Sequence, residues 1–280
     1  MRLLDSLGAK ETPPPIQAFL TTHSPVALRE LSGKQLLVVR PGPARHVVIS
    51  AGSTDEIQST LRTDPEAFLA KSVVVCEGAS EVGFVRGLDL WGAATQQPSF
   101  LALGGAYVNA GGGTPDNAFA RATALMKLGY RVLVFIDADK PAAPGIAEAY
   151  LQSGGSLVTW REGMALEDEL FLCLPDTSID ALLLKAKERV GEDLMNQHLA
   201  AKSNGRTSLA SIEALRPNLP YPPDIRALLG EASRIKKNSW FKSLTTYQSI
   251  VLDIVSHGYA NAEASFKAVV DQLWAFTRAA

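Results

Sequence analysis

Between residues 72 and 174 the chain alternates four times between a short apolar run and a helical pattern, and this alternation constrains the fold most. In the run at 131–136, every residue after Arg131 is apolar, as expected for a buried strand of a parallel sheet. Repeated strand–helix units predict right-handed crossovers and an α/β fold. The expected strands are 73–76, 100–103, 131–136 and 156–160, and the expected helices are 81–91, 116–128, 144–153 and 166–174.

Carboxylates directly follow two of these apolar runs. Glu77 and Glu81 come after the first run, and Asp137 and Asp139 come after the third. Open α/β sheets bind their ligands at the carboxyl ends of parallel strands. Hard divalent cations take oxygen ligands. The sequence therefore predicts a Mg²⁺-type site of an enzyme that acts on phosphates.

Simpler explanations exist for some of these carboxylates. Glu81 falls in the first turn of an expected helix, where the helix dipole favours negative charge. Asp139 lies just before Pro141 and fits a turn with an Asx-type cap. Glu77 is harder to explain structurally, because a carboxylate directly after a Val-Val-Val-Cys run is not expected on a solvated face. Loop residues at strand ends carry functional sites disproportionately often.

Composition narrows the class of protein. The chain has 280 residues, enough for one large or two modest domains, and 46% of them are hydrophobic. Its net charge of −2 gives no global signal for nucleic acid, so local basic clusters have to carry that argument. Cys76 and Cys173 lie in apolar runs without a C-x-x-C spacing, which favours a reducing, cytoplasmic location. No apolar stretch approaches the roughly 20 residues of a membrane span.

Three parts are expected along the chain: residues 1–70, 71–174 and 175–280. The first part contains an expected strand at 16–22, a helix at 26–31 that begins with Ser24 and Pro25, a hairpin of 34–40 with 46–50, and a helix at 54–69. After Pro175 no further strand is expected. The helices expected there are 179–189, 192–201, 208–215, 225–235, 247–256 and 261–277.

The order strand–Glu–Gly, then strand–Asp-x-Asp one βα unit later, resembles the Toprim domain of topoisomerases, primases and related nucleases. The wording VVVCEGASEVGFVRGL resembles most the Toprim domain of the OLD (overcoming lysogenization defect) family of ATP-associated nucleases. That family has a further Glu shortly after its Glu-Gly, as Glu81 is here. The segment 166–171 resembles its late acidic motif, which implies Glu167 as another metal ligand, whereas Asp168 and Glu169 are equally well explained as a solvated first helical turn.

The segment Phe19-Leu-Thr-Thr-His23-Ser-Pro25 resembles the switch-histidine strand of ABC-type ATPases. OLD proteins carry such an ATPase ahead of their Toprim domain, so residues 1–50 are expected to be the tail of an ATPase. The sequence contains no G-x-x-x-x-G-K-[ST] phosphate loop. Its glycine-rich run, Gly111-Gly112-Gly113-Thr114, does not qualify because no Lys follows it. ATP would therefore act only through a missing N-terminal domain.

The densest basic segment is 234–242. Basic side chains beside aromatic ones suit phosphate contact and base stacking, although a solvated helix end with Trp240 and Phe241 in the core fits equally well. The OLD resemblance implies a basic residue near the metals, with Lys242 as first and Lys237 as second candidate. The expected nucleic-acid contacts are Arg234, Lys236, Lys237 and Lys242.

These observations lead to one hypothesis and two alternatives. The hypothesis is a Toprim-type DNA endonuclease or nickase, with two Mg²⁺ or Mn²⁺ ions held by Glu77, Glu81, Asp137, Asp139 and Glu167. Glu77 would serve as both ligand and catalytic residue, and a longer parent protein would form a homodimer. One alternative is a non-catalytic DNA-binding or dimerisation module with a Toprim shell. The other is a D-x-D phosphatase with Asp137 as nucleophile, although Pro141 stands where that pattern has Thr.

Overall fold

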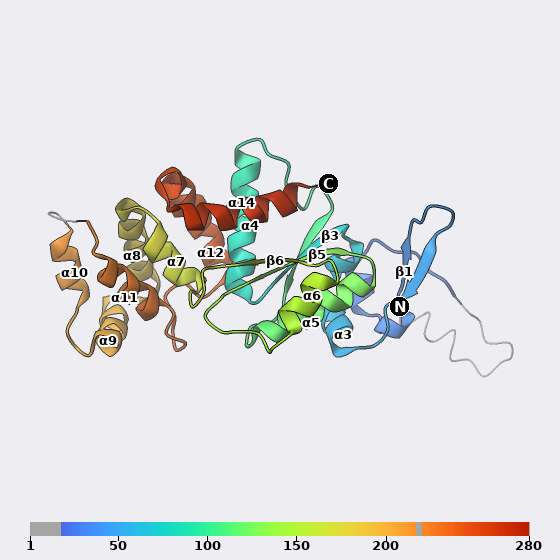
Figure 1. Ribbon diagram of the computed structural model, residues 1–280, viewed down its shortest axis with the longest axis horizontal. Coiled ribbons are helices and arrows are strands. Elements are labelled where there is room, and N and C mark those ends of the chain that lie inside the picture. The colour runs from blue at the N-terminus through green and yellow to red at the C-terminus, as the bar shows by residue number, and fades with distance from the viewer. Residues whose placement is uncertain (1–17, 217–219, 280) are drawn as a thin grey trace.

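The computed structural model describes residues 18–216 and 220–279. At its centre is a four-stranded, all-parallel sheet with the strand order β4-β3-β5-β6 (Figure 1). The inner strands β3 and β5 pair in register from Ser72 opposite Arg131 to Cys76 opposite Phe135. The strands are β3 Ser72–Cys76, β4 Gly105–Asn109, β5 Arg131–Ile136 and β6 Ser156–Thr159.

Helices cover both faces of this sheet. Because strand side chains alternate between faces, Val73 and Val75 join a core with α3, α5 and α6, whereas Val74 and Cys76 join a core with α4, α7 and α14. In Figure 1, α5 and α6 lie on one side of the strands and α14 on the other. These helices are α3 Asp55–Thr63, α4 Ala79–Ala94, α5 Pro115–Lys127, α6 Ile146–Gln152, α7 Leu166–Cys173 and α14 Ala264–Arg278.

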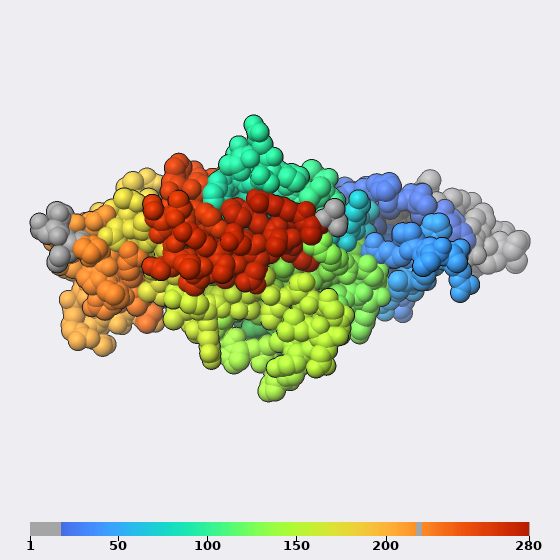
Figure 2. All heavy atoms as spheres, turned by 45° about the horizontal axis from the view of Figure 1, so that its top comes forward, coloured from blue at the N-terminus to red at the C-terminus, as the bar shows by residue number. Residues whose placement is uncertain are grey.

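The described residues after β6 form helices only. Their core is continuous with one face of the sheet, because Phe84 and Phe135 belong to the same buried cluster as Trp240 and Tyr247. α14 lies across the front of the molecule in Figure 2, between the other late helices and the N-terminal residues. The remaining helices are α8 Asp176–Val190, α9 Glu192–Ser203, α10 Leu209–Leu215, α11 Pro223–Ser233, α12 Leu244–Ile250 and α13 Ser256–Gly258, with a π-helical turn at Val251–Val255 and a 3₁₀ turn at Tyr259–Asn261.

The N-terminal part packs against the α3 and α5 side of the sheet. Its helix α2, Pro25–Arg29, begins as predicted, because the Ser24 side chain accepts a hydrogen bond from the Ala27 N–H and Pro25 occupies the first turn. The predicted hairpin is confirmed as two antiparallel strands. Its strands are β1 Leu37–Arg40 and β2 Val47–Ser50, and 3₁₀ turns lie at Gly33–Gln35 and Pro65–Leu69.

Three local predictions are wrong. The apolar run 100–103 is a turn rather than a strand, and the strand begins at Gly105, whose missing side chain makes room for the Phe100 ring. The expected helix 54–69 ends at Thr63 because Pro65 starts a separate 3₁₀ turn. Residues 18–22 form no strand, and residues 16 and 17 of that prediction lie outside the described part.

The strand 131–136 is confirmed at both ends. Continuous apolar side chains identify a strand buried on both faces, and here the expected bounds and the observed ones agree. Within the described residues, no helix has both the length and the apolar character needed to cross a bilayer.

Candidate functional site

The inner strands β3 and β5 end next to each other, and the chain leaves them in opposite directions. After β3 it enters α4 on one face of the sheet, and after β5 it leads to α6 on the other face. A crevice outside the carboxyl ends of the strands is expected where adjacent connections diverge in this way. Glu77 and Asp137 are the first residues after these two strands, so the fold places both carboxylates at the switch point.

Glu77 is fixed through its backbone but not through its side chain. Its N–H donates to the Phe135 carbonyl at 3.1 Å, and its carbonyl accepts from the Gly112 N–H at 2.7 Å. The side chain is only 9% exposed, and its Oε2 is buried with no hydrogen-bond partner in the described part of the chain. Burial raises the pKa of Glu77, Asp139 adds to the rise, and Lys140 counteracts it. A buried carboxylate oxygen without a donor needs a cation or a proton.

Glu81 is both a helix cap and a member of an acidic cluster. Its Oε2 accepts from the Gly78 N–H at 2.7 Å at the start of α4. The capping explanation is therefore confirmed. Burial raises the pKa of Glu81 to about 7, and the nearby carboxylates of Glu167 and Glu77 contribute to the rise. Glu81 can fill both roles at once. Its Oε2 caps the helix at the Gly78 N–H, while its carboxylate also lies close enough to Glu167 and Glu77 to be repelled by them.

The Asp-x-Asp pair after β5 splits into two environments. Asp137 Oδ1 accepts from the Leu166 N–H at 2.9 Å, which ties the end of β5 to the start of α7. Burial raises the pKa of Asp137 well above its ordinary value, with repulsion from Glu81, Glu167 and Glu77 as further causes. Asp139 instead lies at the mouth of the site, where its Oδ2 is 3.2 Å from Arg234 Nη1 and 4.0 Å from Lys140 Nζ.

The start of α7 adds three buried carboxylates with different partners. Glu167 Oε1 accepts a short hydrogen bond from the Tyr247 hydroxyl. Asp168 Oδ2 accepts from the Ala165 N–H at 2.9 Å and lies 3.3 Å from Arg234 Nε. Glu169 forms an ion pair of 2.8 Å with Arg161. Burial raises the pKa of Glu167, and Asp168 adds to the rise, whereas the Tyr247 hydroxyl and Arg234 lower it. Glu167 raises the pKa values of Glu81 and Asp137, whereas Asp168 is affected by Asp139.

We call the five carboxylates predicted as ligands the strand-end cluster. Burial is the main cause of the raised pKa values in it, and repulsion within it contributes: Glu167 and Glu77 raise the pKa of Glu81, and Glu81, Glu167 and Glu77 raise the pKa of Asp137. In the described part of the chain, Lys140 and Arg234 are the cations within 4.0 Å of any member, and both contact Asp139. The strand-end cluster comprises Glu77, Glu81, Asp137, Asp139 and Glu167. It therefore carries more negative charge than the protein neutralises.

The predicted basic segment divides between this cluster and the surface. Arg234 reaches the cluster through Asp139 and also pairs with Asp168. Lys236, Lys237 and Lys242 are exposed, and within the described residues none of them has an ion pair with a carboxylate. Trp240 and Phe241 are fully buried in the core, as the non-functional explanation predicted. The structure thus brings one of the four basic candidates to the acids.

The strand-end cluster fits a divalent cation chemically, but its side chains are turned toward protein donors. Among residues 18–216 and 220–279, no three Asp, Glu, His or Cys side chains are already grouped as a metal centre. Glu81, Asp137 and Glu167 each accept a hydrogen bond from the protein, and Asp139 pairs with Arg234. The unpartnered Glu77 Oε2 and the mutual repulsion of the acids are what a bound cation would relieve.

Sequence reasoning missed two parts of this site. Tyr247 is a fully buried residue of α12, and nothing near it in sequence indicates that its hydroxyl reaches Glu167, 80 residues away. Arg234 was expected to contact nucleic acid rather than Asp139 and Asp168. A buried tyrosine hydroxyl needs a hydrogen-bond partner, but that rule does not identify the partner.

Neither a scan against protein-family models nor a search of curated proteins found a match to this chain. The functional argument therefore rests on the geometry and chemistry of the strand-end cluster.

Proposed function

We propose that this protein is a metal-dependent DNA endonuclease or nickase with a Toprim-type site. The observation that carries the proposal is the excess of carboxylates at the switch point of a parallel sheet, with Glu77 Oε2 buried and unpartnered. The Toprim resemblance of residues 72–174 supports the same assignment. We also propose that the protein is an OLD-type nuclease associated with an ATPase. This more specific assignment rests on the sequence resemblance alone.

The strand-end cluster would hold two Mg²⁺ or Mn²⁺ ions through Glu77, Glu81, Asp137, Asp139 and Glu167. When bound, such ions supply an activated water and stabilise the leaving oxygen of a phosphodiester. The chain's own residues orient these ligands: Gly78 and Leu166 donate backbone N–H groups to Glu81 and Asp137. Arg234 balances charge between Asp139 and Asp168, beside the place where a phosphate would add negative charge.

DNA is the proposed substrate because of the exposed basic residues after α11. Lys236, Lys237 and Lys242 lie on the surface of the segment that begins at Arg234, which contacts the cluster. Phosphate contacts by such side chains give affinity without sequence preference. Lys242 and Lys237 remain the candidates for a lysine that offsets charge at the reacting phosphate.

A second candidate function is supported by a specific observation. Because protein donors already engage Glu81, Asp137 and Glu167, the same side chains are compatible with a non-catalytic DNA-binding or dimerisation module. The phosphatase alternative has no such support, since Pro141 stands where its D-x-D-x-T pattern has Thr.

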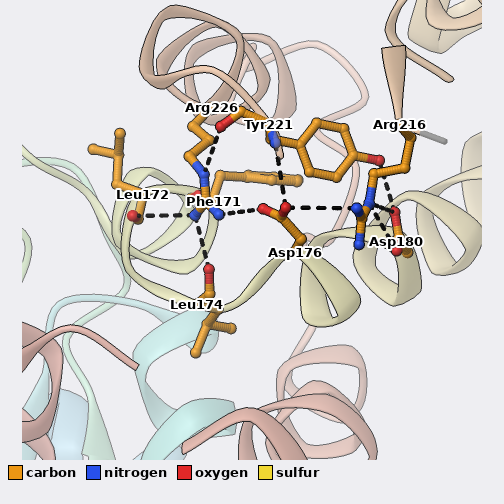
Figure 3. Close-up of polar contacts among 8 residues, drawn as sticks. All are labelled: Phe171, Leu172, Leu174, Asp176, Asp180, Arg216, Tyr221 and Arg226. Atoms are coloured by element: carbon orange, nitrogen blue, oxygen red, sulfur yellow. Dashed lines mark hydrogen bonds and ion pairs between the residues drawn. The ribbon is translucent and has the colours of Figure 1, made fainter. Parts of the chain in front are cut away.

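Nicking of supercoiled plasmid in the presence of Mg²⁺ or Mn²⁺ tests the proposal. The wild-type chain is expected to cut, and chelation is expected to stop cutting. Asp137→Asn should lower the rate at least about 100-fold, equivalent to about 3 kcal/mol of transition-state stabilisation. Asp180→Asn is the matched control, because Asp180 is an acid held by Arg216 and the Tyr221 hydroxyl away from the cluster (Figure 3).

Three outcomes would contradict the proposal. If the wild-type chain cuts no form of DNA with either metal but still binds DNA, the non-catalytic module is the better account. If Asp137→Asn cuts as fast as the wild type, the active site has been assigned to the wrong residues. Phosphate release from a monoester without any nicking would instead favour the phosphatase.

A further inference from the structure

Tyr247 joins the late helices to the strand-end cluster. Its side chain is 0% exposed, and its hydroxyl donates to Glu167 Oε1. A tyrosine hydroxyl is protonated at neutral pH, so it is the donor of this bond. The bond from Tyr247 engages only this one oxygen of the Glu167 carboxylate. One carboxylate oxygen is therefore held by Tyr247 while the other is left for a different partner.

The backbone that carries Tyr247 is held close to α4 by two glycines. A Cβ on Gly83 would lie 2.3 Å from the Leu244 carbonyl oxygen and 2.9 Å from Tyr247 Cβ. A Cβ on Gly87 would lie 2.6 Å from Val251 Cβ. Any larger residue at either position would have to push α12 away from α4. Both glycines are in the helix that begins beside Glu77, so the position of Tyr247 is tied to the cluster.

Aromatic packing fixes the ring of Tyr247 from another side. Phe241 meets it edge to face, with ring centroids 6.4 Å apart and an interplanar angle of 77°. Phe241 in turn packs against Phe171 of α7, the helix that carries Glu167. The hydroxyl is thus aimed at Glu167 by a framework of buried residues, not by a mobile surface side chain.

We propose that Tyr247 is a positioning residue that holds Glu167 in the orientation needed to bind a divalent cation. The inference rests on the proposed function, because it takes Glu167 to be a metal ligand. Groups that hydrogen-bond to metal-ligating side chains fix their orientation, and their loss typically weakens metal binding 10- to 100-fold. In this proposal α12 contributes a residue to a site whose carboxylates follow strands or lie at the start of the helices next to them.

Mn²⁺ binding to the full chain, measured by calorimetry and by the electron paramagnetic resonance signal of free Mn²⁺, tests this inference without an activity assay. Tyr247→Phe keeps the ring and removes the hydroxyl, and it should raise the dissociation constant for Mn²⁺ about 10- to 100-fold. Tyr150→Phe is the matched control. Its buried hydroxyl donates to the Val132 carbonyl at 2.9 Å on the opposite face of the sheet, so its loss should leave Mn²⁺ affinity unchanged.

A double-mutant cycle distinguishes positioning from general loosening of the fold. If Tyr247 acts through Glu167, Tyr247→Phe should have no further effect on Mn²⁺ affinity in a Glu167→Gln background. Gly83→Ala provides a second variant that keeps the hydroxyl. The added methyl group would displace Tyr247 Cβ, so Gly83→Ala should also weaken Mn²⁺ binding. This variant tests the inference should Tyr247→Phe fail to fold.

The outcomes separate this inference from the proposed function. Unchanged Mn²⁺ affinity in Tyr247→Phe would overturn the inference and leave the nuclease proposal intact. Mn²⁺ binding that depends on Tyr247 in a protein that never cuts DNA would overturn the nuclease proposal and support the inference. A wild-type chain that binds no Mn²⁺ would overturn both.

Discussion

Two groups of acids in this molecule are built on opposite plans. The strand-end cluster has five carboxylates, mutual repulsion and a buried oxygen without a donor. The second group, which we call the helical network, comprises Asp176, Asp180, Arg216, Tyr221 and Arg226, and every carboxylate in it meets a guanidinium (Figure 3). In the helical network charge is matched within the protein, which is the expected arrangement for structure.

The difference between the groups separates acids that the fold explains from acids that we propose serve function. Arg226 pairs with Asp176 and also donates to the carbonyls of Phe171, Leu172 and Leu174, so it closes the end of α7. Asp176 and Asp180 are thus explained by the fold alone. The strand-end cluster has no such pairing. Lys140 and Arg234, which lie near Asp139, also lower the pKa values of Glu77 and Glu167, respectively, but in the described part of the chain neither Glu81 nor Asp137 forms an ion pair.

The largest expected effect is on the helical network. Arg226→Ala should lower the free energy of unfolding by about 3 kcal/mol, because it removes one of the two guanidinium partners of Asp176 and leaves carbonyls at the end of α7 without a donor. Denaturant unfolding followed by circular dichroism measures the change. A loss below about 1 kcal/mol would show that the network is not the structural tie described here.

The strand-end cluster should behave in the opposite way when pH is varied. The folded pKa of Glu81 is about 7 against an ordinary value of 4.5, so its ionisation costs stability. That cost is fully present above pH 7 and is relieved as pH falls from 7 toward 4.5. The metal-free protein should therefore gain about 2 kcal/mol of stability between pH 8 and pH 5. Stability that falls over this range would contradict the account.

Neutralising one acid of the cluster should stabilise the metal-free protein. Glu81→Gln keeps an oxygen that accepts from the Gly78 N–H but removes a charge that faces Glu167 and Glu77. A gain of about 1 kcal/mol is expected at pH 8, and it should shrink toward zero at pH 5, where the wild-type carboxyl is largely protonated. Thermal unfolding at both pH values measures it. A loss of stability at pH 8 would place Glu81 with the structural acids.

The smallest effects are expected from the exposed lysines, which belong to neither group. Single alanine substitutions of Lys236, Lys237 and Lys242 should change stability by no more than about 0.5 kcal/mol. Each should reduce the salt dependence of DNA binding by about one unit of log-log slope, if that side chain contacts a phosphate. Fluorescence anisotropy with labelled DNA at several salt concentrations provides the measurement. Unaltered slopes in all three variants would remove this surface from the DNA-binding account.

The sequence predicts the sheet and the strand-end acids because both follow from local patterns. The strand at 131–136 is recognised from its run of apolar residues. The carboxyl ends of parallel strands meet at one edge of the sheet in any strand order, so acids that follow two such strands are brought to the same edge. The run at 100–103 misleads because only Phe100 is buried, where it packs against Gly105, whereas Leu101 is exposed in the turn that follows. Apolar character alone does not distinguish these two uses.

The partners of the acids were not predictable, since they depend on tertiary packing. The Arg234–Asp139 ion pair spans 95 residues, and the Tyr247–Glu167 hydrogen bond spans 80. Nothing in the local sequence around Tyr247 distinguishes it from an ordinary core residue. Its role becomes visible only once Gly83 and Gly87 bring α12 against α4.

A crystal structure of the protein soaked with Mn²⁺, with anomalous scattering used to locate the ions, tests the central claim most directly. The account predicts anomalous peaks in the strand-end cluster, with Glu77 Oε2 and the Asp137 carboxylate as ligands and no peak at the helical network. Peaks confined to other acids, or a strand-end cluster that stays empty at saturating Mn²⁺, would contradict it.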